Sequence, residues 1–330
     1  MVALKVCLIT DTHLSAQKYS KLDKKTGVNR FMIRQFETLE WIADYLKKHK
    51  INTIIHSGDV FDSVRVTAYP IKRTREILDG FDVYAIKGNH DDSNLFHTEE
   101  MSAVDLLGVH SFNKPESVII GGANFCFTPW GFDIDTTLLD KTKKNILVAH
   151  GFPRDYMNGN ETKEVEHDGD VLSISRTTAF DMVITGHYHN IDEFEIKGTK
   201  FLNPGAISGF ANADGNDPSI WILDTETLEY ERVVIPCAIK LITVKPNDVN
   251  NYLSKINKEN IYRITIYSKT DVDNKILSEA KKKALDIQLK IIKTKEEKAN
   301  IEKVDGFWAY VEKHSGYKSE FQKVLVELGA

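Results

Sequence analysis

The sequence lacks any long apolar run, and this absence argues against a membrane protein. No run approaches the roughly 18 apolar residues that indicate a membrane-spanning helix. The first ten residues are strand-like and lack the basic region and cleavage site of a signal peptide. Paired cysteines are also missing, since the three present are scattered and favour neither disulfides nor a thiolate zinc site: Cys7, Cys126 and Cys237. We therefore expect a cytoplasmic protein with no membrane association.

An excess of positive charge is missing as well. The formal net charge is −5, so the chain as a whole is not a basic nucleic-acid binder. Binding to DNA or RNA would have to come from local basic patches, from bound metals or from a partner. With 330 residues, 42% of them apolar, the chain is long enough for one large or two modest domains with a real core.

The first two-thirds of the sequence alternates short apolar runs with helical patterns. Residues 30–48 carry apolar side chains with a 3.6-residue period, and a second helix is predicted over residues 69–78. Buried strands are predicted at residues 4–9, 53–56, 83–86, 145–149 and 182–185. This alternation predicts an α/β fold, with functional groups in loops at the carboxyl ends of the strands.

The pattern changes after His189. Hairpin strands are predicted at residues 194–196, 200–202, 221–224 and 230–235. A smaller α+β region follows, and a charged segment at residues 293–301 reads as a linker. Residues 306–328 predict one or two amphipathic helices. We therefore predict three parts: residues 1–236, 237–300 and 301–330.

Five short polar segments follow predicted strands, and they contain the residues that indicate chemistry. They are Asp11-Thr12-His13, Gly58-Asp59, Gly88-Asn89-His90-Asp91, His150-Gly151 and Gly186-His187-Tyr188-His189. Their carboxylates, amide and imidazoles suit divalent cations. The candidate metal ligands are Asp11, His13, Asp59, Asn89, His150, His187 and His189. The mixed donor set favours two Mn²⁺ ions, with Mg²⁺, Fe or Zn as alternatives.

A pair of divalent cations close together is a standard device for hydrolysing phosphate esters, because it activates water and neutralises the phosphate. Asp59 is a natural bridge, since each of its two oxygens can bind a different cation. Histidine side chains can give up a proton near working pH, so His90 is the candidate general acid, with Asp91 placed to orient its ring. Surface or packing roles are favoured for the remaining histidines, His49, His56, His97, His110, His167 and His314.

In this order, the five segments resemble the calcineurin-like metallophosphoesterases over about residues 4–235. The resemblance implies a four-layer α/β sandwich of two mixed sheets flanked by helices. It assigns one metal to Asp11, His13, Asp59 and His189. It assigns the other to Asp59, Asn89, His150 and His187, with His90 as the acid. The turn Asn203-Pro204-Gly205 also resembles one that recurs in this fold.

Within that superfamily, the segments around Asp11, Asp59 and His90 resemble most the SbcD-type DNA nuclease subunits, including those encoded by phages. The resemblance implies Mn²⁺-dependent exonuclease and endonuclease activity in recombination or repair, and a homodimer. It also implies a small capping domain and a helical tail that docks on a coiled-coil ABC-type ATPase similar to SbcC. Asp62 stands where some relatives have histidine. Basic residues after the first motif are candidates to follow a DNA backbone: Lys18, Lys21, Lys24, Lys25, Arg30 and Arg34.

Two other functions use the same residues. A phosphatase or a small-molecule phosphodiesterase, such as a cyclic-nucleotide hydrolase, would need the same site but no tail or partner. A non-catalytic scaffold would keep the fold as a binding module, and is expected to lose ligands or the acid. All seven ligands and His90 are present, which favours an enzyme.

Overall fold

The computed structural model describes residues 4–16, 21–92, 101–153, 171–208, 217–266 and 271–291. The chain divides into two compact units. The first holds Met1–Thr243, Lys258–Tyr262 and Ala284–Asp286, and the second holds Val244–Asn257, Arg263–Lys283 and Ile287–Ala330. The boundaries predicted near residues 236 and 300 stay predictions. The predicted helical tail, residues 301–330, lies outside the described residues.

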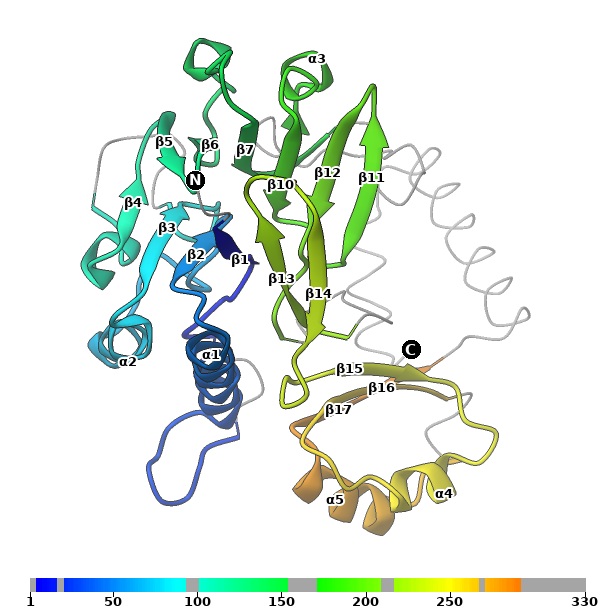
Figure 1. Ribbon diagram of the computed structural model, residues 1–330. Coiled ribbons are helices and arrows are strands. Elements are labelled where there is room, and N and C mark those ends of the chain that lie inside the picture. Colours follow the sequence, from blue (N-terminus) through cyan, green and yellow to red (C-terminus); the bar gives the residue numbers. More distant parts are fainter. Residues whose placement is uncertain are drawn as a thin grey trace, which may run out of the picture. The chain divides into compact units, whose positions relative to one another are not determined.

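The first unit contains two mixed six-stranded sheets (Figure 1). The first sheet has the order β14-β13-β1-β2-β3-β4. Strands β1 to β4 run parallel to one another, and β13 pairs antiparallel with both β1 and β14. The strands are β1 (Lys5–Ile9), β2 (Thr53–His56), β3 (Asp82–Ile86), β4 (His110–Phe112), β13 (Ser219–Asp224) and β14 (Tyr230–Val234).

The second sheet has the order β11-β12-β10-β7-β6-β5. Its central strands β12, β10, β7 and β6 are parallel, and an antiparallel strand closes each edge. The strands are β5 (Glu116–Ile120), β6 (Ala123–Thr128), β7 (Asn145–His150), β10 (Met182–Gly186), β11 (Asp192–Ile196) and β12 (Thr199–Asn203). A two-stranded parallel pair, β8 (Phe152–Pro153) with β9 (Val171–Leu172), follows β7.

The largest apolar cluster joins the two sheets. Leu8 and Ile55 of the first sheet pack in it with Phe125, Ile146 and Ile184 of the second, and all five are buried. Because the central strands are covered on both faces, their sequences are continuous apolar runs and do not alternate. This explains why the strands were recognisable without a period-2 pattern.

Helices α1 (Arg30–His49) and α2 (Ala68–Leu78) cover the outer face of the first sheet. Helix α1 begins at Asn29, whose side chain accepts the N–H groups of Phe31 and Met32, and it ends at Lys50 in the left-handed conformation. The outer face of the second sheet packs with α3 (Ile174–Thr177) and the short 3-10 helix η2 (Thr136–Leu138). A further 3-10 helix, η1 (Val104–Leu107), packs beside α2. The α/β sandwich of two sheets between helical layers is confirmed.

The remaining described elements come after residue 240. A three-stranded sheet has the order β15-β16-β17, formed by β15 (Leu241–Val244), β16 (Ile261–Ile266) and β17 (Asp286–Ile291). The two helices here are α4 (Val249–Ser254) and α5 (Asn274–Lys283). The α+β character that the sequence predicted for this region is confirmed among the described residues. Among the described residues, no helix is long and apolar enough to cross a membrane.

Candidate metal centre

The candidate ligands come from loops at the carboxyl ends of five parallel strands, as the sequence predicted. Asp11 and His13 follow β1, Asp59 follows β2 and Asn89 follows β3. The second sheet contributes His150 at the end of β7, and His187 and His189 after β10. Four of these side chains are buried to within 1% of full coverage, namely Asp11, His13, Asp59 and His150. The other three are partly exposed. The structure brings all seven predicted ligands together.

The backbone at this centre adopts conformations that L-amino acids rarely use. Asp11, His13, Asp59 and His187 all have positive φ, with values of 49°, 42°, 54° and 84°. Such residues lie in the left-handed region, which costs free energy and persists only where surrounding contacts impose it. Four of the seven predicted ligands share this feature, so the strain is concentrated at the centre.

The glycines of the polar motifs are required by close packing. A Cβ on Gly58 would collide with the His150 ring, and one on Gly88 would collide with the Asp59 carboxylate. A Cβ on Gly186 would meet the Thr10 hydroxyl and the Ser57 carbonyl. The loops can approach one another only without these side chains. The glycine in each of the Gly-Asp, Gly-Asn-His and Gly-His motifs therefore has a steric reason.

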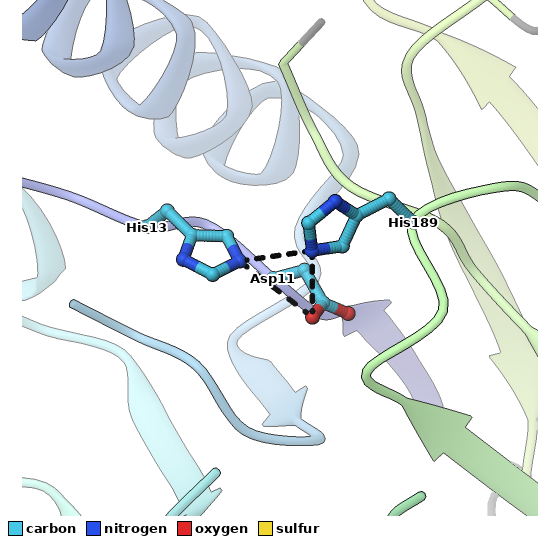
Figure 2. Close-up of side chains that lie close together, drawn as sticks. All are labelled: Asp11, His13 and His189. Carbon is cyan, nitrogen blue, oxygen red and sulfur yellow. Dashed lines mark hydrogen bonds and ion pairs between the residues drawn. The ribbon is translucent and has the colours of Figure 1, made fainter. Parts of the chain in front are cut away.

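One donor group consists of Asp11, His13, Asp59 and His189. Figure 2 shows Asp11, His13 and His189 pointing toward one another. The Nε2 atoms of the two histidines are 3.1 Å apart, and each lies within 3.8 Å of Asp11 Oδ1. Asp59 Oδ2 lies 3.6 Å from His13 Nε2. Two carboxylates and two imidazoles therefore face a common space.

The second donor group consists of Asp59, Asn89, His150 and His187. Asn89 Oδ1 lies 3.0 Å from His150 Nε2 and 3.1 Å from His187 Nδ1, and His150 Nε2 lies 3.4 Å from Asp59 Oδ2. His150 donates its Nδ1–H to the Ser57 carbonyl at 2.8 Å, because a carbonyl can only accept. Its Nε2 is thereby directed into the group, as for a metal-bound histidine held by a backbone carbonyl.

Asp59 belongs to both groups through a single oxygen. Its Oδ2 faces His13 and His150, whereas its Oδ1 accepts the backbone N–H of His90 at 2.9 Å. The sequence analysis expected each oxygen to bind a different cation. An oxygen that accepts one N–H keeps a lone pair for a cation, so this expectation stays a prediction.

His90 lies beside the first group, with its ring centroid 4.8 Å from that of His13. Its Nδ1 is 2.9 Å from the Asp62 carbonyl oxygen, which must accept, so Nδ1 carries a proton. The Nε2 atom is the one left for proton transfer. The Asp62 carboxylate lies 3.4 Å from His13 Nδ1, so this residue contacts both histidines.

Asp91 has partners other than the one expected. Its two carboxylate oxygens accept the backbone N–H groups of Val60, Phe61 and Gly88 at 2.9–3.1 Å. The orienting contact with the His90 ring is made by the Asp62 carbonyl instead. Asp91 is buried and joins the loop after β2 to the loop after β3. It therefore supports the positions of Asp59 and Asn89 through the backbone.

Burial and neighbouring charges shift the pKa values of several side chains in this centre. Burial acts to raise the pKa of Asp59, but the neighbouring His150 outweighs it and holds this pKa well below its usual range. Burial acts to lower the pKa of His150, and Asp59 outweighs it and raises this pKa to about 9. Burial lowers the pKa of His189 to about 4. Burial, together with Asp59, raises the pKa of Asp91 to about 6. The centre thus holds anionic oxygens next to imidazoles, which is the electrostatics that a cation requires.

The turn at Asn203 fixes the loop that carries His187 and His189. The Asn203 side chain donates to the Tyr188 carbonyl at 2.6 Å and accepts from the Gly205 N–H at 3.1 Å. Ala206 donates its N–H to the His189 carbonyl at 3.0 Å. The sequence indicated a tight turn at these residues but not its partners. Its role follows from contacts that join residues 15 positions apart.

Several predicted DNA-contacting cations have other partners. Lys21 donates to the Ala284 carbonyl, Arg30 pairs with Glu259, and Arg34 contacts Glu37 and the Cys237 carbonyl. Lys24 and Lys25 are exposed, and Lys18 lies outside the described residues. Three of the six cations therefore stabilise the protein itself.

The histidines assigned to surface or packing roles are confirmed where they are described. His49 stacks on Tyr45 and His110 stacks on Tyr84. His56 is buried, with its Nε2 atom 3.1 Å from the Thr12 hydroxyl oxygen. The others, His97, His167 and His314, lie outside the described residues.

Comparison with known proteins gives one family and several relatives. The profile of the calcineurin-like phosphoesterase superfamily domain matches residues 4–228. Exonuclease subunit 1 of Enterobacteria phage T4 is 27% identical over 210 residues, which cover 58% of this chain and 59% of that protein. The DNA double-strand break repair protein Mre11 of Saccharolobus solfataricus is 25% identical over 159 residues, 43% of this chain and 39% of that protein.

A second Mre11, from Methanosarcina mazei, is 24% identical over 255 residues, 71% of this chain and 38% of that protein. The chain thus spans between 38% and 59% of the length of these curated relatives. Among solved structures, an archaeal phosphodiesterase has a TM-score of 0.39 at 19% identity, covering 70% of this chain and 99% of its own.

Proposed function

The chain belongs to the calcineurin-like phosphoesterase superfamily, and we propose that it is a two-metal nuclease that hydrolyses phosphodiester bonds of DNA. The observation that carries the proposal is the pair of donor groups that share Asp59 Oδ2, with His90 beside them. The donor set fits two divalent cations. It combines anionic oxygens with neutral amide and imidazole donors, and His150 is oriented by a backbone carbonyl.

In this proposal, Asp11, His13, Asp59 and His189 hold one cation, and Asp59, Asn89, His150 and His187 hold the other. Bound there, two divalent cations would neutralise the phosphate and activate water for in-line attack. Mn²⁺ suits the mixed oxygen and nitrogen donors best, with Mg²⁺, Fe and Zn as the alternatives.

His90 is the proposed general acid. Because its Nδ1–H is given to the Asp62 carbonyl, its Nε2–H is the proton available for the leaving alkoxide. The partly exposed side of the centre, where His90, Asn89, His187 and His189 lie, is where the phosphodiester would approach. Asp91 is proposed to act on Asp59 and Asn89 through the backbone of their loops, and not on the phosphodiester.

DNA is the proposed substrate because three curated relatives are named as an exonuclease subunit or as DNA break repair proteins. We further propose exonuclease and endonuclease activity in recombination or repair, a homodimer, a cytoplasmic location, and an SbcC-like ABC-type ATPase as partner. Residues 237–300 would form the capping domain, and residues 301–330 the tail that docks on the ATPase.

The test compares substrates on one preparation of protein. The full chain, purified and stripped of metal, is given Mn²⁺ and then linear duplex DNA, single-stranded DNA or bis-p-nitrophenyl phosphate. Each reaction is repeated with the candidate ATPase and ATP. We expect cleavage of DNA that depends on Mn²⁺ and responds to the ATPase.

The control is the Asp59→Asn variant, which keeps the side-chain shape and removes the shared charge. Cleavage of the small ester alone would replace the nuclease by a small-molecule phosphodiesterase. No turnover of any substrate with Mn²⁺ bound would favour a scaffold. DNA cleavage that persists in the variant would indicate a contaminating nuclease.

A further inference from the structure

One polar side chain interrupts the buried apolar face of α1 and reaches the metal centre. Gln35 is 1% exposed, and its buried neighbours on the helix are apolar except for Thr38. The Thr38 hydroxyl donates a hydrogen bond to the Arg34 carbonyl of the same helix. Gln35 instead bonds outside the helix. Burying an amide costs free energy unless the amide is hydrogen-bonded. The hydrogen-bond partners of Gln35 therefore indicate its role.

The Gln35 amide contacts the loop that carries the first two ligands. Its Nε2 atom lies 2.7 Å from the His13 carbonyl oxygen and 3.2 Å from the Thr12 carbonyl oxygen. Both partners can only accept, so the NH₂ group must face them and the orientation of the amide is determined. Its Oε1 atom is buried and has no hydrogen-bond partner among the described residues. The side chain therefore serves as a double donor.

The N–H groups of the loop after β1 are hydrogen-bonded to the loop after β2. The N–H groups of Asp11, His13 and Leu14 donate to the carbonyls of Gly58, Asp59 and Val60 at 2.9–3.0 Å. The Gln35 amide donates to both the Thr12 and the His13 carbonyls, and the His13 carbonyl also accepts the Ala16 N–H at 3.2 Å. Without Gln35, the two buried carbonyls lose this donor, and the loop loses its contact with the helix through this amide.

The strained backbone of the loop after β1 explains why the hydrogen bonds from Gln35 are important. Asp11 and His13 have φ values of 49° and 42°, so the residue between them is flanked by two left-handed conformations. A segment of this kind relaxes toward negative φ unless hydrogen bonds oppose the change. Relaxation would rotate both side chains away from His189 and Asp59.

We infer that Gln35 is a positioning residue whose amide clamps the Thr12 and His13 carbonyls, so that Asp11 and His13 hold a divalent cation. The inference rests on the proposed metal centre. A role in filling space alone would be met better by leucine or methionine, which leave no buried amide oxygen unsatisfied. Gln35 touches neither the cation nor the substrate, so it acts only through the two ligands.

Two variants separate hydrogen bonding from volume. Gln35→Met keeps the size of the side chain and removes the donors, and Gln35→Glu keeps its shape but, when ionised, only accepts. Thr38→Val is the matched control, because it removes a buried polar group one turn along the same helix face. Mn²⁺ affinity is measured by calorimetry and electron paramagnetic resonance. The unfolding temperature is measured with and without Mn²⁺.

Both Gln35 variants should bind Mn²⁺ about 10–100-fold more weakly than wild type, and the Mn²⁺-induced rise in unfolding temperature should shrink. Thr38→Val should bind Mn²⁺ as wild type does. Equal Mn²⁺ affinity in wild type and Gln35→Met would overturn the role of Gln35. Failure of the wild type itself to bind two Mn²⁺ ions would instead overturn the proposed metal centre.

A measurement on the wild type keeps the inference falsifiable where a variant does not fold. The side-chain amide protons of Gln35 should exchange slowly with solvent in nuclear magnetic resonance spectra. Exchange at the rate of an exposed glutamine would overturn the inference.

Discussion

The two sheets contribute different chemistry to one centre. The loops after β1, β2 and β3 supply both carboxylates, the amide and the candidate acid, whereas the loops after β7 and β10 supply only imidazoles. The oxygen-bearing loops are tied to one another directly, through the N–H groups of Asp11, His13 and Leu14 and through Asp91. The imidazole-bearing loops are held by the Ser57 carbonyl, which contacts His150, by the Asp11 carboxylate, which accepts the His187 N–H, and by the Asn203 turn.

The two carboxylates of the centre, Asp11 and Asp59, are therefore held by hydrogen bonds among the loops of one sheet. Three of the four imidazole ligands, His150, His187 and His189, come from the other sheet. A change at Asp59 should therefore disturb both proposed cations, whereas a change at one histidine of the second sheet should disturb mainly the cation assigned to it. The predictions below probe that contrast, beginning with the largest effect.

Asp59→Asn is expected to have the largest effect. The substitution keeps the shape of the side chain but removes the charge that faces His13 and His150 together. Binding of both Mn²⁺ ions and hydrolysis of DNA should fall to background. Metal content and DNA cleavage measure this, and Asp44→Asn, at an exposed position on α1, is the control. Two tightly bound Mn²⁺ ions in the variant would contradict the shared role of Asp59.

His90→Ala should reduce hydrolysis by about 10²–10⁴-fold while both Mn²⁺ ions remain bound, because it removes a proton donor and no ligand. Single-turnover cleavage and Mn²⁺ titration test the two halves of this expectation. His110→Ala, which alters a histidine stacked on Tyr84 away from the centre, should cleave as wild type. Unchanged cleavage by His90→Ala would remove its assigned role.

The stability of the metal-free protein should depend on pH through the contact between the two sheets at Asp59 and His150. Asp59 raises the pKa of His150 from 6.5 to about 9. The resulting stabilisation, about 3 kcal/mol, is present in full below pH 6.5 and is lost as pH rises through about 9. Denaturant unfolding in EDTA at several pH values measures it, with His150→Gln as the reference. Parallel curves for the two proteins would refute the coupling.

Asn203→Ala should have the smallest effect of the four. It leaves the Tyr188 carbonyl and the Gly205 N–H without their side-chain partner, which should cost about 1–3 kcal/mol of unfolding free energy. Mn²⁺ affinity should fall about 10–100-fold, because the loop holding His187 and His189 loosens. Asn113→Ala, at an exposed position, is the control. An undiminished affinity would show that the Asn203 turn is not needed to hold this loop.

Much of this arrangement was accessible from the sequence, because each polar motif directly follows an apolar strand. The strands leading to Asp11, Asp59, Asn89, His150 and His187 were all predicted, and so was the α/β class. Their assignment to two metals, and of His90 to acid catalysis, stays a prediction. The convergence of Asp11, His13 and His189, and of Asp59 with His150, agrees with the assignment of the metals.

What the sequence did not reveal depends on turns and on distant pairings. Asp62 contacts two histidines, and Asp91 binds backbone N–H groups. These contacts depend on residues in the left-handed conformation, which no local sequence pattern predicts. The sequence analysis also made no prediction for β5 and β6. Nor did it place the hairpin β13–β14 beside β1, since pairing across about two hundred residues leaves no periodic signal.

The position of β1 has a consequence for how the chain folds. Lys5–Ile9 is synthesised before the strand that begins at Ser219, yet it lies between that strand and β2. Until the strand at Ser219 has been synthesised, one edge of β1 is unpaired. An unpaired strand edge can form hydrogen bonds with other chains and so promote aggregation. Closing so long a loop is slow, because its entropy is lost before the contacts form. Shortening the chain before Asp224 should therefore yield aggregates rather than a smaller folded enzyme.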